Sequence, residues 1–391
     1  MMDYEKLLSD KCKSMKPSGI RKFFDIAATM DDVISLGVGE PDFQTPWTIR
    51  REAIKTLEKG RTVYTANAGL IELRRAVCRY LKRRCKLEYV PEKEVIITVG
   101  GSEAIDLAIR AVVNPGDEVL VVEPSFVCYK PIIELMHGVP VVIETKIDHN
   151  FKLTAEALRE KITDKTKMLI LPFPNNPTGA AMTRDELEEI AAVLRGTDIL
   201  VLSDEIYSEL TYSGRHTSIA ELEGMQERTL LVNGFSKAYA MTGWRLGYIA
   251  GPAPLLSQML KIHQYAIMSS PTISQYAAIE AMDNCDNEVE KMKNEYDLRR
   301  RWLVNAFNEI GLECFEPMGA FYVFPSIKST GMTSQQFCED LLMKYKVAVV
   351  PGDAFGECGE GHIRVSYAYS LKHLKAAVER IKKYLNETKG V

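Results

Sequence analysis

One lysine in this sequence lies where it could act as a nucleophile. Lys237 follows the apolar run at 229–234 and lies eight residues before Arg245, which Gly243 and Gly247 flank. An apolar setting and a second cation both disfavour the ammonium form, so the neutral amine becomes available to form an imine with a carbonyl compound. A lysine at a sheet edge, taken alone, more often keeps its charge in solvent. The spacing therefore indicates imine chemistry only in combination with other residues.

Residues that could assist such an amine follow other apolar runs. Gly101 and Ser102 come after the run at 95–99, and a helix starting there would offer free N–H groups to a phosphate. Asp204 ends another run, where a buried carboxylate needs a cation or a hydrogen-bond donor. Asn176 belongs to the turn sequence Asn-Asn-Pro-Thr-Gly. Each also has an ordinary reading as a tight turn, a helix cap or a solvated strand end.

The elements that must position these residues alternate regularly from about residue 90 onward. Seven apolar runs separated by helix-like stretches predict an α/β fold, with a mostly parallel seven-stranded sheet covered by helices on both faces. Ligands of such sheets bind beyond the carboxyl ends of the strands, where the candidate residues would meet. The runs are VIITV (95–99), EVLVVE (118–123), VPVVIE (139–144), KMLILP (167–172), ILVLSD (199–204), TLLVNG (229–234) and LGYIAG (246–251).

The pattern changes after residue 285. A long charged helix is expected at about 286–310, followed by short strands and a final helix, which predicts a smaller α+β domain. We therefore expect an N-terminal segment (1–45) that packs with the small domain, a large domain (46–285) and a small C-terminal domain (286–391).

Composition excludes several classes of protein. A net charge of −4, from 49 Lys and Arg against 53 Asp and Glu, argues against nucleic acid or an anionic membrane as the main partner. No apolar stretch reaches the length of a membrane span or a signal peptide. The eight cysteines form no CxxC pair, which indicates reduced thiols and a cytoplasmic protein. The six histidines show no metal-ligand spacing, so no metal site is expected.

Taken together, the order GGS, NPTG, D-E-x-Y, S-K-x₇-R and a late arginine resembles the fold-type I aminotransferases, which use pyridoxal 5′-phosphate (PLP). The segment from Gly234 to Gly247 is similar to that family's lysine-attachment signature. The similarity extends to 37–43, 64–69 and 363–368 and so covers nearly the whole chain. Within the family, the chain most resembles the aromatic and N-acetyl-LL-diaminopimelate aminotransferases. This resemblance implies an enzyme that moves an amino group between an L-amino acid and a 2-oxo acid by a ping-pong mechanism.

The resemblance also implies roles around the cofactor ring. Lys237 would form the aldimine with PLP and then act as general base and acid. Asp204 would face the pyridine nitrogen, and Tyr207 and Asn176 would hydrogen-bond the ring oxygen. Phe126 would stack on the ring.

Phosphate and substrate contacts are implied in the same way. The phosphate would bind the backbone N–H groups of Gly101 and Ser102, the hydroxyl of Ser236 and the guanidinium of Arg245. Residues expected to contact the substrate are Gly39, Asn176 and Arg364, with Arg364 gripping the α-carboxylate. Tyr64 matches a tyrosine that reaches the phosphate from the neighbouring subunit, which implies a homodimer.

Alternatives remain open on the sequence alone. A PLP-dependent C–S β-lyase of the same fold would use the same lysine, aspartate and arginine. A regulator built on this scaffold would need a DNA-binding domain, for which the chain is too short and not basic enough. The amino donor and acceptor cannot be read from these residues.

Some other residues have a less specific reading. Arg21, Phe23 and Tyr322 are candidates for the wall around the substrate side chain, or take part in ordinary packing. His263 is expected to be structural, and Arg299–Arg301 are expected to form a solvated face.

Overall fold

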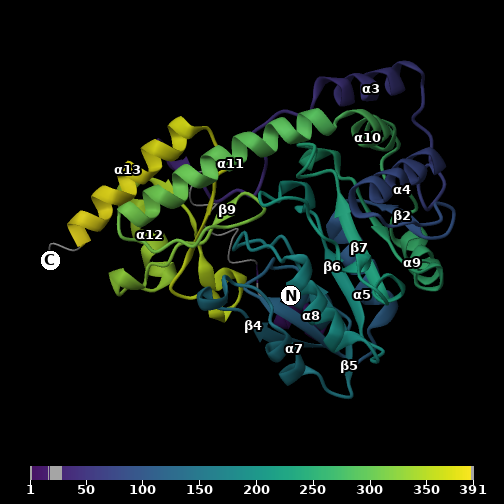
Figure 1. The fold of residues 1–391 in the computed structure, drawn as a ribbon, viewed down its shortest axis with the longest axis horizontal. Coiled ribbons are helices and arrows are strands. Elements are labelled where there is room, and N and C mark those ends of the chain that lie inside the picture. Colours follow the sequence, from purple (N-terminus) through teal and green to yellow (C-terminus); the bar gives the residue numbers. More distant parts are fainter. Residues whose placement is uncertain (1, 16, 18–28, 389–391) are drawn as a thin grey trace.

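The computed structural model describes residues 2–15, 17 and 29–388 of the chain. Within these residues, the largest sheet has seven strands in the order β2-β8-β7-β6-β5-β3-β4 (Figure 1). All neighbouring pairs are parallel except those that β8 makes with β2 and β7. The strands are β2 (Val95–Thr98), β3 (Glu118–Glu123), β4 (Val139–Glu144), β5 (Thr166–Leu171), β6 (Leu200–Asp204), β7 (Thr229–Gly234) and β8 (Gly247–Ala250). The predicted mostly parallel, seven-stranded sheet is confirmed.

Helices cover both faces of this sheet, as predicted. Val119 and Val121 of β3 pack with one set of helices, whereas Leu120 and Val122 pack with another, because successive strand side chains point to opposite faces. The first set is α5 (Gly101–Val112), α6 (Tyr129–Leu135) and α9 (Ala253–Ala266). The second set includes α7 (Ala155–Lys161) and α8 (Arg184–Leu194). Beside it, α4 (Ile71–Cys85) and α10 (Thr272–Asn284) pack on β2, β7 and β8.

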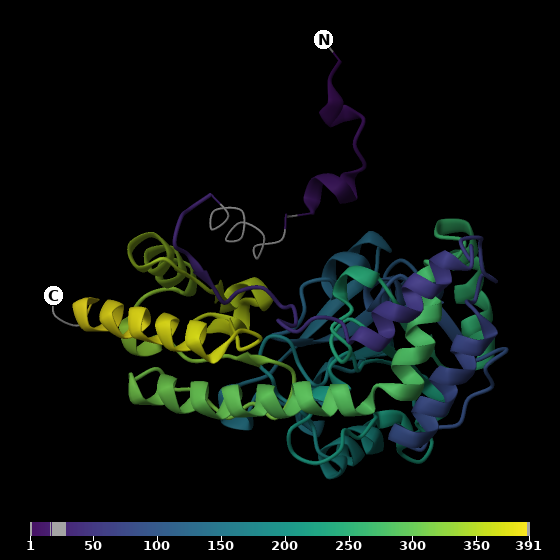
Figure 2. The same ribbon diagram turned by 90° about the horizontal axis from the view of Figure 1, so that it is seen from above.

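A second group of elements follows the large sheet in the sequence. The helix α11 (Asp286–Glu309) runs from α10 to α13 (Leu371–Thr388), as Figures 1 and 2 show. Around it lie α12 (Ser334–Tyr345) and a three-stranded sheet in the order β11-β12-β9. These strands are β9 (Tyr322–Val323), β11 (Val350–Pro351) and β12 (Ile363–Ser366).

The N-terminal part of the chain contacts both groups of elements. β1 (Ile34–Ser35) pairs in parallel with β10 (Val347–Ala348), and α3 (Trp47–Glu58) packs on α10. Figure 2 shows α1 (Asp10–Ser14), the second of two dark purple helical turns below the mark N, standing away from the rest of the molecule. No helix of the described part is long and apolar enough to cross a membrane.

The arginine run on α11 corrects one expectation. Arg299 and Arg300 are 6% and 4% exposed, so they do not form a solvated face. Arg299 donates to both carboxylate oxygens of Asp42 at 2.9 Å, and Arg300 contacts Asp297 and Glu316. Desolvating a guanidinium is costly, and these carboxylates compensate for it. Asp42 lies 257 residues from Arg299 in the sequence, so the local charge pattern could not reveal this partner.

Candidate active site

One cavity of about 420 Å³ lies at the carboxyl ends of the central strands. Every residue expected to contact cofactor or substrate lines it, except Tyr64. The sheet brings several of them together directly: Gly101 and Ser102 follow β2, Phe126 follows β3, Asn176 follows β5, Asp204 ends β6, and Ser236 and Lys237 follow β7. The other elements contribute Gly39, Tyr207, Arg245, Tyr322 and Arg364. Burial of so many polar groups around one space indicates a binding site.

The amine of Lys237 lies at the centre of this arrangement. Its Nζ donates a 2.6 Å hydrogen bond to the carbonyl oxygen of Gly39 and lies 5.9 Å from the centre of the Tyr207 ring. Burial, followed by the nearby positive charge of Arg364, lowers the pKa of Lys237 to about 8. The neutral amine is therefore far more abundant near neutral pH than in an ordinary lysine, as its nucleophilic role requires.

Asp204 is buried and lines the cavity. Its Oδ2 accepts a 2.7 Å hydrogen bond from the hydroxyl of Tyr129, and its Oδ1 accepts one of 3.2 Å from the backbone N–H of Ile206. Burial raises the pKa of Asp204, while these two hydrogen bonds lower it. Sequence reasoning missed Tyr129, although it lies only three residues after Phe126. Its pairing with an aspartate 75 residues away depends on the tertiary fold.

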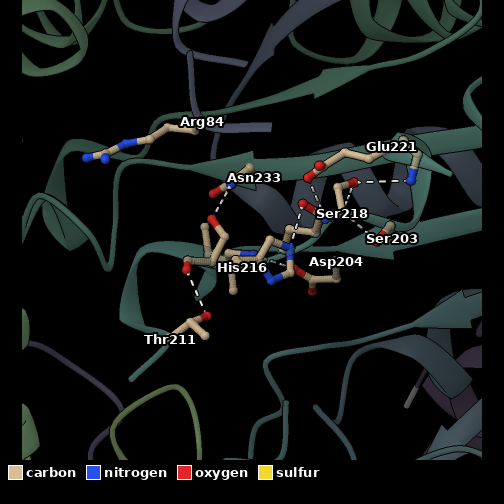
Figure 3. A network of polar contacts seen from close by, with 12 residues as sticks. Arg84, Ser203, Asp204, Thr211, His216, Ser218, Glu221 and Asn233 are labelled. Carbon is tan, nitrogen blue, oxygen red and sulfur yellow. Dashed lines mark hydrogen bonds and ion pairs between the residues drawn. The ribbon is translucent and has the colours of Figure 1, made fainter. Parts of the chain in front are cut away.

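A second layer of polar groups lies beside Asp204 (Figure 3). The neighbouring carboxylate of Glu205, 1% exposed, accepts hydrogen bonds from the hydroxyls of Ser203 and Ser218 at 2.8 and 2.6 Å. Its other oxygen lies 3.0 Å from Nε2 of His216. These contacts tie the carboxyl end of β6 to the loop that precedes Ile219, and so fix the backbone from which Asp204 projects.

The turn before α5 offers a site for an anion. α5 begins at Gly101, and its N-cap, Gly100, has a φ of 79° and no side-chain cap. The first N–H groups of a helix have no intrahelical acceptor, so those of Gly101 and Ser102 remain available at the cavity wall. A Cβ added to Gly100 would lie 2.8 Å from Nη2 of Arg245. Glycine at this position therefore lets a cation approach the turn.

Arg364 also lines the cavity and is almost completely buried. Its guanidinium lies between the rings of Tyr322 and Phe355, at 4.6 and 4.7 Å from their centres. It donates to Oδ1 of Asn176 at 2.8 Å and to the carbonyl oxygen of Gly37. Its Nε is buried and has no hydrogen-bond partner within the described residues. An unpaired donor in such a place indicates a missing acceptor, such as a carboxylate.

The remaining candidates differ in their positions. Tyr207 and Tyr322 share a 2.8 Å hydrogen bond between their hydroxyls, and Tyr322 lines the cavity. Tyr64 lies outside the cavity and is 79% exposed. Arg21 and Phe23 lie outside the described residues.

Comparison with known proteins identifies the family. The family model "Aminotransferase class I and II" matches residues 31–381. The chain is 55% identical over 381 residues to "Putative aminotransferase YugH" of Bacillus subtilis, covering 97% of this chain and 99% of that one. It is 46% identical to an aspartate aminotransferase of Pyrococcus abyssi (98% and 99% covered) and 44% identical to a probable N-acetyl-LL-diaminopimelate aminotransferase of Bacillus subtilis (97% and 96%). This chain belongs to the class I and II aminotransferases.

A solved structure agrees with this assignment. The aromatic aminotransferase from Pyrococcus horikoshii superimposes with a TM-score of 0.90 at 44% identity, covering 95% of this chain and all of the other. The expected fold type I and the expected aminotransferase activity are thereby confirmed. Membership of this family also implies PLP as the cofactor.

The residues of the cavity fit PLP chemically. PLP carries an aldehyde, a phosphate and a pyridine nitrogen. The cavity holds an amine of lowered pKa at Lys237, free amides and a cation at Gly101 and Arg245, and a buried carboxylate at Asp204. Its volume of about 420 Å³ lies within the range typical of small-molecule sites.

Proposed function

We propose that this cavity binds PLP through Lys237 and catalyses transamination of an L-amino acid whose α-carboxylate binds Arg364. The observation that carries the proposal is the convergence of an amine, an anion-binding turn and a buried carboxylate on one cavity. When bound, PLP supplies an electron sink for the bonds at the substrate α-carbon. Asp204 would hold a proton at the pyridine nitrogen. Phe126 would pack against the ring, and Ser236 and Arg245 would bind the phosphate.

Lys237 would also move the proton of the reaction. In one half-reaction, its Nζ would take the proton from the substrate α-carbon and deliver it to the cofactor carbon that had carried the aldehyde. In the other half-reaction, it would move a proton in the reverse direction. A pKa of about 8 suits both directions, because a base works best when its pKa is near the working pH. Tyr207 would hydrogen-bond the ring oxygen together with Asn176. Its hydroxyl is already oriented by Tyr322.

Arg364 would orient the substrate. Within the described residues, the buried Nε of Arg364 has no hydrogen-bond partner, so an α-carboxylate would not have to displace one of them from that atom. The guanidinium is held by contacts with the rings of Tyr322 and Phe355, which pre-organises its contact with a carboxylate. The backbone of Gly39 lies close to Tyr322, since a Cβ added to Gly39 would collide with the Tyr322 hydroxyl.

We further propose that the working unit is a homodimer to which Tyr64 contributes across the interface. Exposed apolar side chains on neighbouring elements support this: Trp47 (57%) and Leu57 (52%) on α3, Val63 (74%) and Tyr64 (79%) on the following loop, and Tyr265 (88%) on α9. The loop is anchored by Thr272 to the carbonyl oxygen of Val63 and by Asn67 to that of Met268. Such a patch on one face is typical of a subunit interface.

Two further expectations stay proposals. We propose the division into 1–45, 46–285 and 286–391, supported by the change of architecture at α11 and by the pairing of β1 with β10. We also propose a cytoplasmic location, supported by the eight cysteines, all of which are free thiols.

The experiment measures products with and without an amino acceptor. The purified protein, loaded with PLP, is incubated with a panel of L-amino acids. A transaminase converts the amino acid over many turnovers only when a 2-oxo acid is supplied in excess over the enzyme. A β-lyase, in contrast, releases ammonia and pyruvate without any acceptor. Lys237→Ala is the matched control, and it should be folded but inactive. Turnover of a sulfur amino acid without any acceptor would overturn the proposal.

A further inference from the structure

A buried pair of side chains lies behind the anion-binding turn. Nδ1 of His263, on α9, lies 2.6 Å from Oε1 of Glu103, in the first turn of α5. The other oxygen of Glu103 accepts the backbone N–H of Val99 at 2.5 Å. His263 is fully buried, and the Glu103 side chain is 10% exposed. The pair therefore connects both sides of the turn formed by Gly100, Gly101 and Ser102 to a separate helix.

The position of Glu103 makes its orientation important. A glutamate three residues after the N-cap is attracted to the free N–H groups at the start of its own helix. The residues that carry the first of those N–H groups, Gly101 and Ser102, line the cavity. In this chain the carboxylate is instead directed backward, because one oxygen binds Val99 and the other binds His263.

The direction of this hydrogen bond follows from its acceptor. An ionised carboxylate can only accept hydrogen bonds, so Nδ1 of His263 donates to Oε1 of Glu103. Nε2 of His263 is buried and has no hydrogen-bond partner within the described residues. Among those residues, Glu103 is therefore the partner that holds the imidazole ring.

We propose that Glu103 and His263 are positioning residues for cofactor binding. By holding the carboxylate of Glu103 against Val99, His263 keeps the amides of Gly101 and Ser102 free for the phosphate of PLP. The inference rests on the proposed function, in which that turn binds the phosphate. A positioning role predicts that loss of the pair weakens binding of the phosphate but not of the rest of the cofactor. A simple packing role between α5 and α9 predicts no such difference.

The experiment compares PLP with pyridoxal, which has the same ring and aldehyde but no phosphate. Dissociation constants of both are measured by absorbance titration of the apoenzyme. We expect His263→Leu to weaken PLP binding about tenfold or more, the range that loss of a hydrogen bond to a charged group produces. Pyridoxal binding should stay within about twofold, and inorganic phosphate should compete less well with PLP in the variant.

Two amide variants control for folding. His263→Asn places an N–H close to the position of Nδ1 and should retain PLP affinity, whereas His263→Gln places it near Nε2 and should lose affinity as His263→Leu does. These two variants decide the question if His263→Leu fails to fold. Adding Glu103→Gln to either losing variant should restore PLP affinity, because a neutral amide competes weakly for the helix N-terminus. His362 is another buried histidine. The substitution His362→Leu should leave the ratio of the PLP and pyridoxal dissociation constants unchanged.

The outcomes separate the inference from the proposed function. If the wild-type apoenzyme binds PLP but His263→Leu and His263→Gln weaken PLP and pyridoxal equally, the pair has only a packing role and the inference is overturned. Unchanged PLP binding in both variants overturns it as well. If the wild-type protein itself does not bind PLP, the proposed function fails instead.

Discussion

The hydroxyl of Tyr129 donates a 2.7 Å hydrogen bond to Oδ2 of Asp204, inside the cavity wall. Tyr129 opens α6, whereas Asp204 ends β6, so the contact joins two elements that cover and form the central sheet. It stabilises the negative charge of a carboxylate that burial would otherwise neutralise. The hydrogen bond therefore lowers the pKa of Asp204 and favours its charged form, which can accept a hydrogen bond from a protonated ligand.

Tyr129→Phe tests this relationship. The ring of Tyr129 packs edge-to-face on Phe126 at 6.2 Å, and phenylalanine should retain that packing. Loss of the hydroxyl should lower kcat about tenfold, since a hydrogen bond to a charged group contributes about 1.5–3 kcal/mol, while KM changes little. Steady-state kinetics measure both. In an Asp204→Asn background the same change should have almost no further effect, and an equal loss there would show that Tyr129 does not act through Asp204.

The lowered pKa of Lys237 predicts a pH dependence of cofactor capture. Only the neutral amine attacks an aldehyde, and the neutral fraction increases as pH rises through the pKa of about 8. The rate of covalent PLP attachment to the apoenzyme should therefore rise below pH 8 and level off above it. Stopped-flow absorbance measures this rate. Arg364→Met removes one cause of the lowered pKa and should move the curve to higher pH. A wild-type rate that keeps rising to pH 10 would contradict the prediction.

The buried ion pair between Arg299 and Asp42 predicts a stability effect. Asp42→Asn would remove the negative charge, and one of the two oxygens, to which Nη1 of Arg299 donates, and would leave a guanidinium that is 6% exposed without that charge partner. We expect the free energy of unfolding to fall by about 2–3 kcal/mol, somewhat below the cost for a fully buried pair because the Asp42 side chain is 24% exposed. Glu295→Gln, at the more exposed partner of the same arginine, should cost less than about 1 kcal/mol. Equal shifts in urea midpoint for the two variants would contradict this.

The sheet was predictable because its signal is local. Each of the seven apolar runs became a strand, with bounds shifted by no more than one residue at either end. The capping box of Thr183 and Glu186 at the start of α8 is also present. These features depend on residues a few positions apart, and burial on both faces of a parallel sheet leaves a continuous apolar run.

The parts that could not be predicted depend on distant partners. Thr272 and Gln275 resemble a capping box, and α10 does begin at Thr272, but the helix has no side-chain cap. Gln275 instead accepts from the backbone N–H of Leu70, 205 residues away. Tyr129 with Asp204 and Glu103 with His263 are of the same kind, since each pair forms only when the helices are in place.

Arg364→Lys should impair both substrate binding and turnover. The guanidinium contacts the rings of Tyr322 and Phe355 and is anchored to Asn176. A guanidinium can present two parallel N–H groups to a planar carboxylate. A lysine ammonium is a point charge without that geometry. The substrate α-carbon would then be misplaced relative to Nζ of Lys237, and a displacement of about 1 Å can cost about 10²-fold in rate.

The decisive comparison uses two substrates that differ only in the carboxylate. For an amino acid, kcat/KM should fall by about 10²-fold or more in Arg364→Lys. For the amine that lacks the carboxyl group, the already low kcat/KM should change by less than about threefold, because Arg364 has no partner on that substrate. Equal losses for both substrates would mean that Arg364 supports the walls of the cavity, through Tyr322 and Phe355, and that the carboxylate binds elsewhere.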